Sequence, residues 1–396
     1  MRLPNCSQPI VQLIDLYKTG GAEKVYDLFS SWCNQNNILT KRVVLIKSEV
    51  ADIDYLLEEN RTSLIAKALD QLKAIRRLKK IVRRQKCRTL VSFCDRSNIV
   101  SILALGKSRK YKVVATVHNP PTIQYQKLNS VVQKAVFAVL RHFYNRKNVQ
   151  VIAVSEMVKN SLEKIGIKNV RTVLNPLVVD YSKQEETVND IPSRPYFLFI
   201  GRLEEQKAIW KLIKAFFLYL RKIQDMPDAV NSDVAPKALL IVGTGSQQAK
   251  IEKLIFELGL EKNVHLLGYK ANVFPYLKNC ASLVFSSIFE GFPITLLECM
   301  ALKKPFLGSD RAIPDELKEL LKDNAGDFYY TTTDFSTDEG SAFSATKFCD
   351  DSRVLSAILE GFADFSKAQM FRMQAEKNFD WFCRNCSVQN FKRYFE

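Results

Sequence analysis

The 396-residue sequence lacks any apolar run of the roughly 18–20 residues that a membrane-spanning helix needs. Its first residues, MRLPNCSQPIVQLIDLYKTGG, lack the pattern of a signal peptide. The sequence also contains no low-complexity tract and no repeat with a period of about 20–50 residues. We therefore expect a protein of the cytoplasm. Its length exceeds that at which a single hydrophobic core keeps growing, which predicts two domains.

The nine cysteines are scattered and odd in number, and several stand inside apolar segments. This distribution predicts buried thiols rather than a disulfide framework. Cys383 and Cys386 form a lone CRNC segment, whereas a structural zinc site needs a second pair of ligands at a suitable spacing. We expect neither a metal site nor a resident cofactor.

Acidic residues are nearly missing from residues 71–155, which hold 19 Lys and Arg but only one acid, Asp95. The rest of the chain holds 39 basic and 41 acidic residues. Such a local excess indicates an anionic partner, which could be nucleic acid, anionic lipid or a phosphorylated substrate. A merely solvated basic face is the alternative. Because no zinc-finger, helix-turn-helix or aromatic RNA-binding pattern is present, we expect no nucleic-acid partner.

Apolar, β-branched segments alternate with segments of helical periodicity along the first half of the chain. Strands are expected at residues 10–15, 42–46, 89–94, 112–118 and 149–154. Helices are expected around residues 21–34, 65–86, 97–106 and 128–146. Strands that are apolar on both faces and alternate with helices predict a parallel sheet covered by helices.

The polar stretch DYSKQEETVNDIPSRP (180–195) breaks this alternation and is expected to be a linker. The alternation then restarts, with strands expected at 196–201, 238–243, 264–269, 281–286 and 305–308 and helices at 208–223, 246–258, 294–302 and 314–322. The predicted fold class is therefore α/β, with two Rossmann-like doubly wound domains in series. The domains are expected over residues 1–179 and 196–375, with a helix over 376–396 that packs back on the first domain.

Ligands of doubly wound sheets bind outside the carboxyl ends of the strands, so the loops after the strands are the places to search for a site. The first such loop, KTGGAEK (18–24), opens a helix and contains Gly20 and Gly21. Paired glycines let a ligand approach the backbone closely, and a helix N-terminus attracts anions. Another, VHNPP (117–121), places His118 in a loop rather than in the core, which makes a ligand-facing role and a structural role comparably plausible.

Two further strand ends carry charge. The segment GRLEEQK (201–207) places Arg202 and Lys207 on a short connection where two cations could grip a diphosphate. The segment FEGFPITLLECMA (289–301) follows a strand and opens a helix, with Pro293 suited to its first position. The N–H groups near Gly291, Phe292, Pro293, Ile294 and Thr295 then form an anion seat, with Glu290 outside it and Glu298 farther along the helix.

In this order, the segments GGAE, His118, GRLxxQK and FEGFPxxLLE, the last with its E-x7-E pattern, resemble retaining glycosyltransferases of family 4, which have the GT-B fold. The resemblance covers nearly the whole chain and is most specific over residues 196–310. It implies two Rossmann-like domains that face each other across a cleft. It also implies that Arg202 and Lys207 hold the diphosphate of a nucleotide sugar and that Glu298 binds the ribose hydroxyls.

The resemblance assigns the remaining motif residues to the donor sugar and its phosphates. Glu290 would face the sugar, with His118 reaching it from the other domain, so that these two form the catalytic pair. The backbone N–H groups after Gly291 would bind the sugar and the phosphates, and Gly20 and Gly21 would line the side of the cleft that holds the phosphates. The implied reaction is metal-independent transfer from a UDP-linked hexose or N-acetylhexosamine to a glycan or lipid-linked acceptor in bacterial surface polysaccharide or lipopolysaccharide synthesis.

Two positions depart from the family pattern, and one rival reaction remains. Ala208 stands where the family often has glycine, and Thr244 stands where it often has an acid in the GxG segment VGTGS (242–246). The segment DID (52–54) mimics a metal-binding motif of another transferase fold but lies away from a clear strand end. An epimerase-like enzyme acting on nucleotide sugars is the alternative within the same fold.

The basic segment LKAIRRLKKIVRRQKCR (72–88) has an apolar stripe at helical spacing, comprising Leu72, Ile75, Leu78 and Val82. We expect this stripe to pack on the domain's own sheet in preference to lipid. The cations would then face outward, chiefly Arg76, Arg77, Lys79, Lys80, Arg83 and Arg84. Each cation near an anionic membrane contributes about 1 kcal/mol. The expected location is therefore peripheral, at the inner face of the cytoplasmic membrane.

Overall fold

The computed structural model describes residues 8–17, 20–47, 53–57, 64–224, 236–321, 329–330 and 365–395. The chain divides into two compact units. The first unit comprises Met1–Val178 and Asn385–Glu396, and the second comprises Val179–Arg384. Lys18 and Thr19 of the KTGGAEK segment and Asp52 of the DID segment lie outside the described residues.

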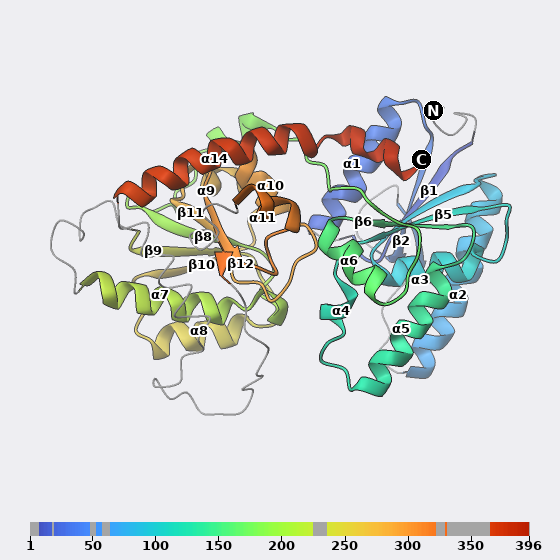
Figure 1. Ribbon diagram of the computed structural model, residues 1–396, viewed down its shortest axis with the longest axis horizontal. Helices are drawn as coiled ribbons and strands as arrows, with labels where there is room; N and C mark the ends of the chain where they lie inside the picture. Colours follow the sequence, from blue (N-terminus) through green and yellow to red (C-terminus); the bar gives the residue numbers. More distant parts are fainter. Residues whose placement is uncertain are drawn as a thin grey trace. The chain divides into compact units, whose positions relative to one another are not determined.

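The first unit contains a seven-stranded sheet in the order β3-β2-β1-β4-β5-β6-β7 (Figure 1). Its strands are β1 (Ile10–Ile14), β2 (Thr40–Ile46), β3 (Asp54–Leu57), β4 (Thr89–Phe93), β5 (Lys112–Val117), β6 (Val149–Ala153) and β7 (Val170–Thr172). Every neighbouring pair is parallel. All five residues of β1 are buried, as are four of five in β4, which is the burial expected of a parallel sheet with both faces covered.

Helices connect successive strands of this sheet, because parallel strands require crossovers. They are α1 (Gly21–Gln35), α2 (Leu64–Arg84), α3 (Asp95–Leu105), α4 (Pro121–Gln124), α5 (Ser130–Tyr144) and α6 (Glu156–Lys164). The 3-10 helix η4 (Val388–Tyr394) returns to this unit from the end of the chain and packs on α1. There the ring of Phe29 contacts Phe391 edge-on at 5.2 Å, and the ring of Trp32 stacks on Phe395 at 6.1 Å.

The second unit contains a six-stranded parallel sheet in the order β10-β9-β8-β11-β12-β13. Its strands are β8 (Tyr196–Ile200), β9 (Ala238–Val242), β10 (Val264–Gly268), β11 (Ser282–Phe285), β12 (Phe306–Ser309) and β13 (Tyr329–Tyr330). Its helical elements are η1 (Tyr181–Glu185), η2 (Glu205–Lys207), α7 (Ile209–Gln224), α8 (Gln248–Glu257), α9 (Phe274–Asn279), α10 (Ile294–Ala301), α11 (Asp315–Leu321) and α14 (Phe365–Asn385). Residues 180–195, expected to be a linker, thus begin with η1 and belong to this unit.

Each of the ten expected strands is present, with bounds that differ by at most two residues. Strands β3, β7 and β13 were not expected, because each is short and lies near or at an edge of its sheet. Asp54 of the DID segment begins β3, so this residue lies at the start of a strand and not after the end of one. The prediction of a single helix over 376–396 was wrong, because α14 ends at Asn385 and a separate helix, η4, follows it. Ser387 caps η4 by accepting a hydrogen bond from the Gln389 N–H at 3.2 Å.

Both sheets reverse their strand order at one place, between β1 and β4 in the first unit and between β8 and β11 in the second. At such a switch point the neighbouring crossovers lie on opposite faces of the sheet and leave a crevice at the carboxyl ends of the two strands. These strand ends carry Asp15 and Asp95 in the first unit, and the loops with Lys207 and Glu290 in the second. The fold therefore directs the search for a site to these four residues.

Candidate active site

An ion pair joins the two loops at the switch point of the second unit. Lys207 ends η2, in the loop that follows β8, and Glu290 lies between β11 and α10. The Lys207 Nζ donates a hydrogen bond to Glu290 Oε1. Only 9% of the Glu290 side chain and 19% of the Lys207 side chain are exposed. A carboxylate buried to this extent needs a charged partner, and Lys207 supplies it.

Backbone and side-chain hydrogen bonds hold the same two loops in register. The Ile288 N–H donates to the Gln206 carbonyl at 2.7 Å, and Gln206 Nε2 donates to the Phe289 carbonyl at 3.0 Å. Ser286 Oγ donates to the Lys207 carbonyl at 2.8 Å. On its other side, the Glu290 N–H donates to the Arg311 carbonyl at 2.9 Å. The backbone around Glu290 is therefore held by hydrogen bonds to the loop after β8 and to the segment after β12.

The GxG segment after β9 supports the loop that carries Arg202 and Lys207. The Leu203 N–H donates to the Thr244 carbonyl at 2.9 Å. A Cβ on Gly243, whose φ is +141°, would lie 1.9 Å from the Gly201 carbonyl oxygen, and a Cβ on Gly245 would lie 2.5 Å from that of Leu203. These glycines are thus required by the contact between two loops of the protein.

Arg202 lies apart from the Lys207–Glu290 pair. Its side chain is exposed. The hydroxyl and the N–H of Ser246 donate hydrogen bonds to the Glu204 carboxylate and lower its pKa, and the charge of Arg202 contributes less to the same shift. The structure therefore brings Lys207, but not Arg202, into contact with Glu290. Ala208, where glycine is frequent in the family, adopts the left-handed conformation with φ +44° and is 1% exposed, which explains the usual glycine.

Helix α10 begins at Ile294, the start expected from the helical pattern over 294–302. Pro293 is its N-cap, with an extended ψ of 127°, so the expectation that Pro293 opens the helix was wrong. Gly291, Phe292, Pro293 and Ile294 are buried and Thr295 is half-buried. Glu298 lies one turn beyond Thr295 on the helix and is 2% exposed. The N-terminal turn of α10, whose dipole favours anions, thus begins four residues after Glu290.

In the first unit, His118 follows β5 and is held as a neutral ring. Its Nε2 lies 2.9 Å from Thr116 Oγ1, while the Thr116 hydroxyl donates to the Ser92 carbonyl at 3.0 Å. Because that hydroxyl has one proton, which it gives to Ser92, Nε2 of His118 is the donor between them, and in a neutral ring Nδ1 is then unprotonated. Burial lowers the pKa of His118 to about 4, which also favours the neutral ring. Gly20 is the N-cap of α1 and Gly21 its first residue, at the carboxyl end of β1.

Two carboxylates at the switch point of the first unit were not predicted from the sequence. Asp15 follows β1 and accepts a hydrogen bond from Ser97 Oγ, and burial raises its pKa. Asp95 follows β4 and accepts from Gln124 Nε2 at 3.1 Å. Burial, followed by the nearby charge of Asp15, raises the pKa of Asp95 to about 6. The available signal was that Asp95 is the sole acid of residues 71–155 and directly follows an expected strand.

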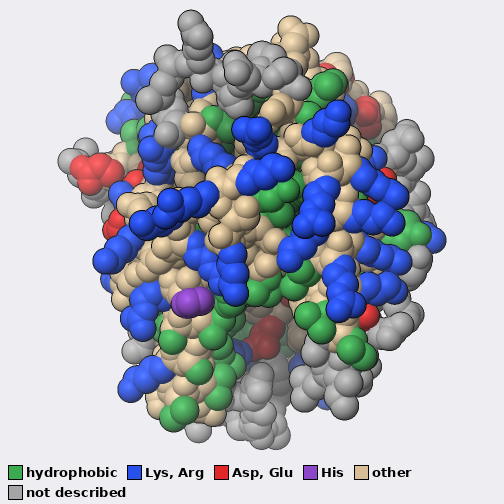
Figure 2. All heavy atoms as spheres, turned by 90° about the vertical axis from the view of Figure 1, so that its right-hand side faces the viewer, with side chains coloured by type: hydrophobic (Ala, Val, Ile, Leu, Met, Phe, Trp, Pro, Cys, Tyr) green, Lys and Arg blue, Asp and Glu red, His purple; other side chains and the backbone are tan. Residues whose placement is uncertain are grey.

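Helix α2 carries the basic residues named from the sequence, but its buried stripe differs from the expected one. Ala74, Leu78 and Val82 are fully buried, whereas Leu72 is 52% exposed. Arg76, Lys80, Arg83 and Arg84 are exposed, and Arg77 and Lys79 are half-exposed. Figure 2 looks onto this side of the first unit and shows a face dominated by Lys and Arg. Within the described ranges, no helix combines the length and the apolarity needed to cross a membrane.

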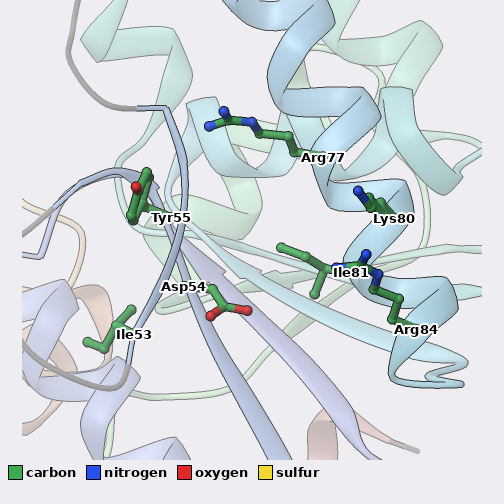
Figure 3. Close-up of a pocket in the computed structure, with 7 residues that line it drawn as sticks. All are labelled: Ile53, Asp54, Tyr55, Arg77, Lys80, Ile81 and Arg84. Atoms are coloured by element: carbon green, nitrogen blue, oxygen red, sulfur yellow. The ribbon is translucent and has the colours of Figure 1, made fainter.

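A pocket of about 280 Å³ lies between β3 and α2 (Figure 3). Its lining combines three cations from successive turns of α2 with residues of the β3 segment: Ile53, Asp54, Tyr55, Arg77, Lys80, Ile81 and Arg84. Arg77 Nη1 donates to the Leu56 carbonyl at 2.9 Å, and Asp54 pairs with Lys41 at 3.0 Å. Of the named cations of α2, Arg77 thus binds the backbone of β3. Across the described residues, no group of three His, Cys, Asp or Glu side chains is arranged to hold a metal ion.

Two family comparisons cover most of the chain. Residues 182–326 match the family described as Glycosyl transferases group 1, and residues 52–183 match the family described as Glycosyltransferase Family 4. These two ranges contain all of the motif residues from His118 to Glu298. Together with two parallel-sheet α/β units, they define a GT-B protein. The chain belongs to glycosyltransferase family 4 and is related to glycosyltransferases of bacterial surface polysaccharides and lipopolysaccharides.

Individual relatives agree with this assignment. The chain is 26% identical to N-acetylgalactosamine-N,N'-diacetylbacillosaminyl-diphospho-undecaprenol 4-alpha-N-acetylgalactosaminyltransferase of Campylobacter jejuni, over 56% of this chain and 58% of that protein. It is 29% identical to lipopolysaccharide 1,6-galactosyltransferase of Salmonella typhimurium, over 40% of this chain and 42% of that protein. The chain thus spans about half the length of these two relatives. The crystal structure of Anabaena HepE with UDP and glucose has the same fold, with a TM-score of 0.70, 17% identity and 98% of both chains covered.

Proposed function

We propose that this protein transfers a hexose or an N-acetylhexosamine from a nucleoside diphosphate sugar to a glycan or lipid-linked acceptor, with retention of configuration. A UDP-sugar is the favoured donor. The observation that carries the proposal is the Lys207–Glu290 pair at the switch point of the second unit. The lysine is a cation that can bind a diphosphate, and the glutamate is a carboxylate that can bind sugar hydroxyls. Hydrogen bonds between the two loops hold both residues in position. Bacterial surface polysaccharide or lipopolysaccharide is the proposed product class.

The reaction breaks the bond between the anomeric carbon and the phosphate oxygen and forms a bond between that carbon and an acceptor hydroxyl oxygen. The acceptor proton passes to the departing phosphate, on the same face of the sugar. Lys207 and Arg202 stabilise the charge that grows on the diphosphate, assisted by the N-terminal turn of α10. These groups supply the electrostatic stabilisation without a divalent ion.

The other motif residues orient the donor. Glu298 on α10 binds the ribose hydroxyls, and Glu290 binds the hydroxyls of the transferred sugar. Gly20 and Gly21, at the N-terminus of α1, admit the phosphates close to the backbone. His118 is neutral near pH 7 and serves as a hydrogen-bonding partner of the sugar rather than as a cation.

A membrane surface is the proposed place of work, at the inner face of the cytoplasmic membrane. The cations of α2 and the local excess of 19 basic residues over one acid support it. A lipid-linked acceptor makes this location useful, and the Campylobacter jejuni relative is named for a diphospho-undecaprenol acceptor. Binding to vesicles should grow with their anionic lipid content, weaken with salt and drop when Arg76, Arg77, Lys79, Lys80, Arg83 and Arg84 become glutamine. Unchanged sedimentation of that variant would leave these cations as a solvated face.

The central experiment is a panel of nucleotide sugars, read by slow donor hydrolysis and by thermal shift of the protein. Hydrolysis of one UDP-hexose or UDP-N-acetylhexosamine, with a shift in unfolding temperature on UDP binding, is the expected result. Retained configuration at the anomeric carbon should follow from NMR of the transfer product. A donor that is isomerised with no release of nucleoside diphosphate would contradict the proposal and favour the epimerase-like alternative.

A further inference from the structure

Helix α5 (Ser130–Tyr144) exposes apolar residues along one of its faces. Val131 is 76% exposed, Val132 43% and Val139 48%. Ala135 and Ala138 are also exposed. With 3.6 residues per turn, these five residues fall on the same side of the helix, over about two and a half turns. An amphipathic helix of a soluble domain normally turns such a face toward its core.

The opposite face anchors α5 to the first unit, so the exposed face is a fixed surface. Leu140 and Tyr144 are buried, and the Tyr144 hydroxyl lies 3.1 Å from Asn98 Nδ2. The ring of Phe137 packs on Tyr125 at 6.4 Å, and Gln133 Nε2 donates to the Tyr125 carbonyl at 3.0 Å. Turning the apolar face inward would break these contacts.

The charged residues of α5 itself and of the sequence on either side of it have a single sign. No acidic residue occurs between Asp95 and Glu156 in the sequence. Lys134 and Arg141 are exposed and lie two turns apart along one edge of the apolar face. Figure 2 shows hydrophobic side chains beside Lys and Arg on this side of the first unit. An apolar face bordered by cations is typical of helices that lie in the interface of an anionic membrane.

We propose that α5 is the membrane-inserting helix of this protein. It would lie parallel to the bilayer plane, with Val131, Val132 and Val139 among the upper acyl groups and Lys134 and Arg141 at the lipid phosphates. Helix α2 has its stripe buried at Ala74, Leu78 and Val82, so it contributes charge alone. The inference deepens the proposed function and depends on it only for the choice of a membrane as the place of work.

A lipid surface fits this face better than a protein partner does. The centres of protein interfaces are enriched in Tyr, Trp and Met, whereas the exposed face of α5 consists of valines and alanines, followed by His142 in the last turn. Three part-exposed valines also give a weak anchor by themselves, so attachment should need both insertion and anionic lipid. This double requirement separates insertion from simple electrostatic adsorption.

The test compares two variants with the same replacement residue, glutamine, which is a good helix former. V131Q/V132Q/V139Q removes the apolar face without changing the charge, and K134Q/R141Q removes two cations and keeps that face. Binding to vesicles of phosphatidylcholine with rising phosphatidylglycerol is measured at low and high salt. The valine variant should bind about tenfold more weakly at both salt concentrations. The cation variant should be weaker at low salt only.

Insertion is read separately by placing tryptophan at position 131. Its fluorescence, taken as the difference from the parent protein, should be quenched by brominated lipids. The matched control is Leu39→Trp, because Leu39 is 67% exposed in the same unit but lies outside α5. Unquenched tryptophan at position 131, or a valine variant that binds like the parent, would overturn the proposal. A concentration-dependent dimer that only the valine variant loses would assign the face to a second copy of the chain instead.

Donor hydrolysis distinguishes this inference from the proposed function. The valine variant should hydrolyse the nucleotide sugar as fast as the parent, because α5 carries no residue of the site. Vesicle binding without any transfer activity in the parent would contradict the proposed function and leave the insertion of α5 standing. Transfer activity with unchanged vesicle binding in the valine variant would contradict only the insertion.

Discussion

Lys207 and Glu290 form an ion pair although 83 residues separate them in the sequence. The pair joins the carboxyl ends of β8 and β11, where the strand order of the second sheet reverses. Both side chains are largely buried. A diphosphate would draw on the Lys207 charge, and a sugar hydroxyl could then donate to the Glu290 carboxylate. The resting pair thus keeps both groups oriented for the donor.

Replacing either member of this pair should reduce transfer strongly. We expect Lys207→Ala and Glu290→Ala each to lower kcat/KM at least about a hundredfold, because loss of one charge-stabilising contact costs roughly 10²–10³ in rate. Each change also leaves a buried charge without its partner, so the unfolding temperature should fall. Lys253→Ala, at a lysine whose side chain is 76% exposed, is the matched control. Near-normal kcat/KM in either variant would show that the pair is structural.

Arg202→Ala should separate the catalytic effect from the structural one. Arg202 is exposed and does not contact Glu290, so its loss should leave the unfolding temperature nearly unchanged. If it grips the diphosphate, kcat/KM should still fall at least about a hundredfold. Steady-state kinetics and thermal unfolding of the one variant give both answers. A variant with full activity would remove Arg202 from the proposed donor site.

Transfer should not require a divalent metal ion. The diphosphate charge is met in the proposed site by Lys207, Arg202 and the N-terminal turn of α10. Activity measured after dialysis against EDTA should therefore equal that of the untreated enzyme within about twofold. Addition of Mg²⁺ or Mn²⁺ serves as the control. Loss of activity in EDTA that either ion restores would contradict this assignment of roles.

The sequence predicted the fold well because the strands at the centre of each sheet are buried on both faces and read as apolar runs. β1 and β8 are examples, with burial along nearly their whole length. The missed strands lie at or near edges, where burial and therefore apolarity are weak, as in β3, which begins with Asp54. Periodicity alone also misassigned the buried stripe of α2, because Ala74 carries little hydrophobic signal and Leu72, which carries more, is exposed.

The sequence indicated candidate site residues but not the contacts between them. Motif spacing pointed to Lys207 and Glu290, yet nothing in the sequence indicated that they pair while Arg202 stays apart. That outcome depends on the backbone hydrogen bonds between the two loops, such as Ile288 to Gln206. Asp15 was missed for a different reason. A single aspartate after a strand is unremarkable until the strand order places it beside Asp95.

Ala208 offers a test of backbone strain beside the site. Its φ of +44° costs a residue that has a Cβ about 1–2 kcal/mol of stability. Glycine avoids this strain, but its more flexible unfolded chain cancels part of the gain. We therefore expect Ala208→Gly to leave stability unchanged or to raise it by up to about 1 kcal/mol, with normal activity. Ala208→Val should destabilise the second unit, because a β-branched residue fits neither the conformation nor a site that is 1% exposed. Thermal unfolding of both variants provides the measurement, and a stable valine variant would contradict the argument.

The free energy of unfolding should depend on pH because Asp95 is buried beside Asp15, and Asp95→Asn should remove this dependence. The pKa of Asp95 rises from 3.8 to about 6, mainly through burial and then through the Asp15 charge. A raised folded-state pKa favours folding fully below pH 3.8, and this advantage is lost as the pH rises through about 6. Near pH 7 the ionised carboxylate therefore costs at most about 3 kcal/mol.

Asp95→Asn should relieve this cost and slow the enzyme. Its unfolding temperature should exceed that of the parent at pH 7.5, by an amount equivalent to about 1–3 kcal/mol, and the difference should shrink as the pH falls toward 4. Glu163→Gln, at an exposed acid of the same unit, is the control and should show no such trend. A destabilising acid at a switch point is characteristic of a functional site, so we expect transfer by Asp95→Asn to fall at least about tenfold. A variant that is more stable but fully active would show that Asp95 has no role in transfer. A variant with no pH-dependent gain in stability would show that the carboxylate is well solvated.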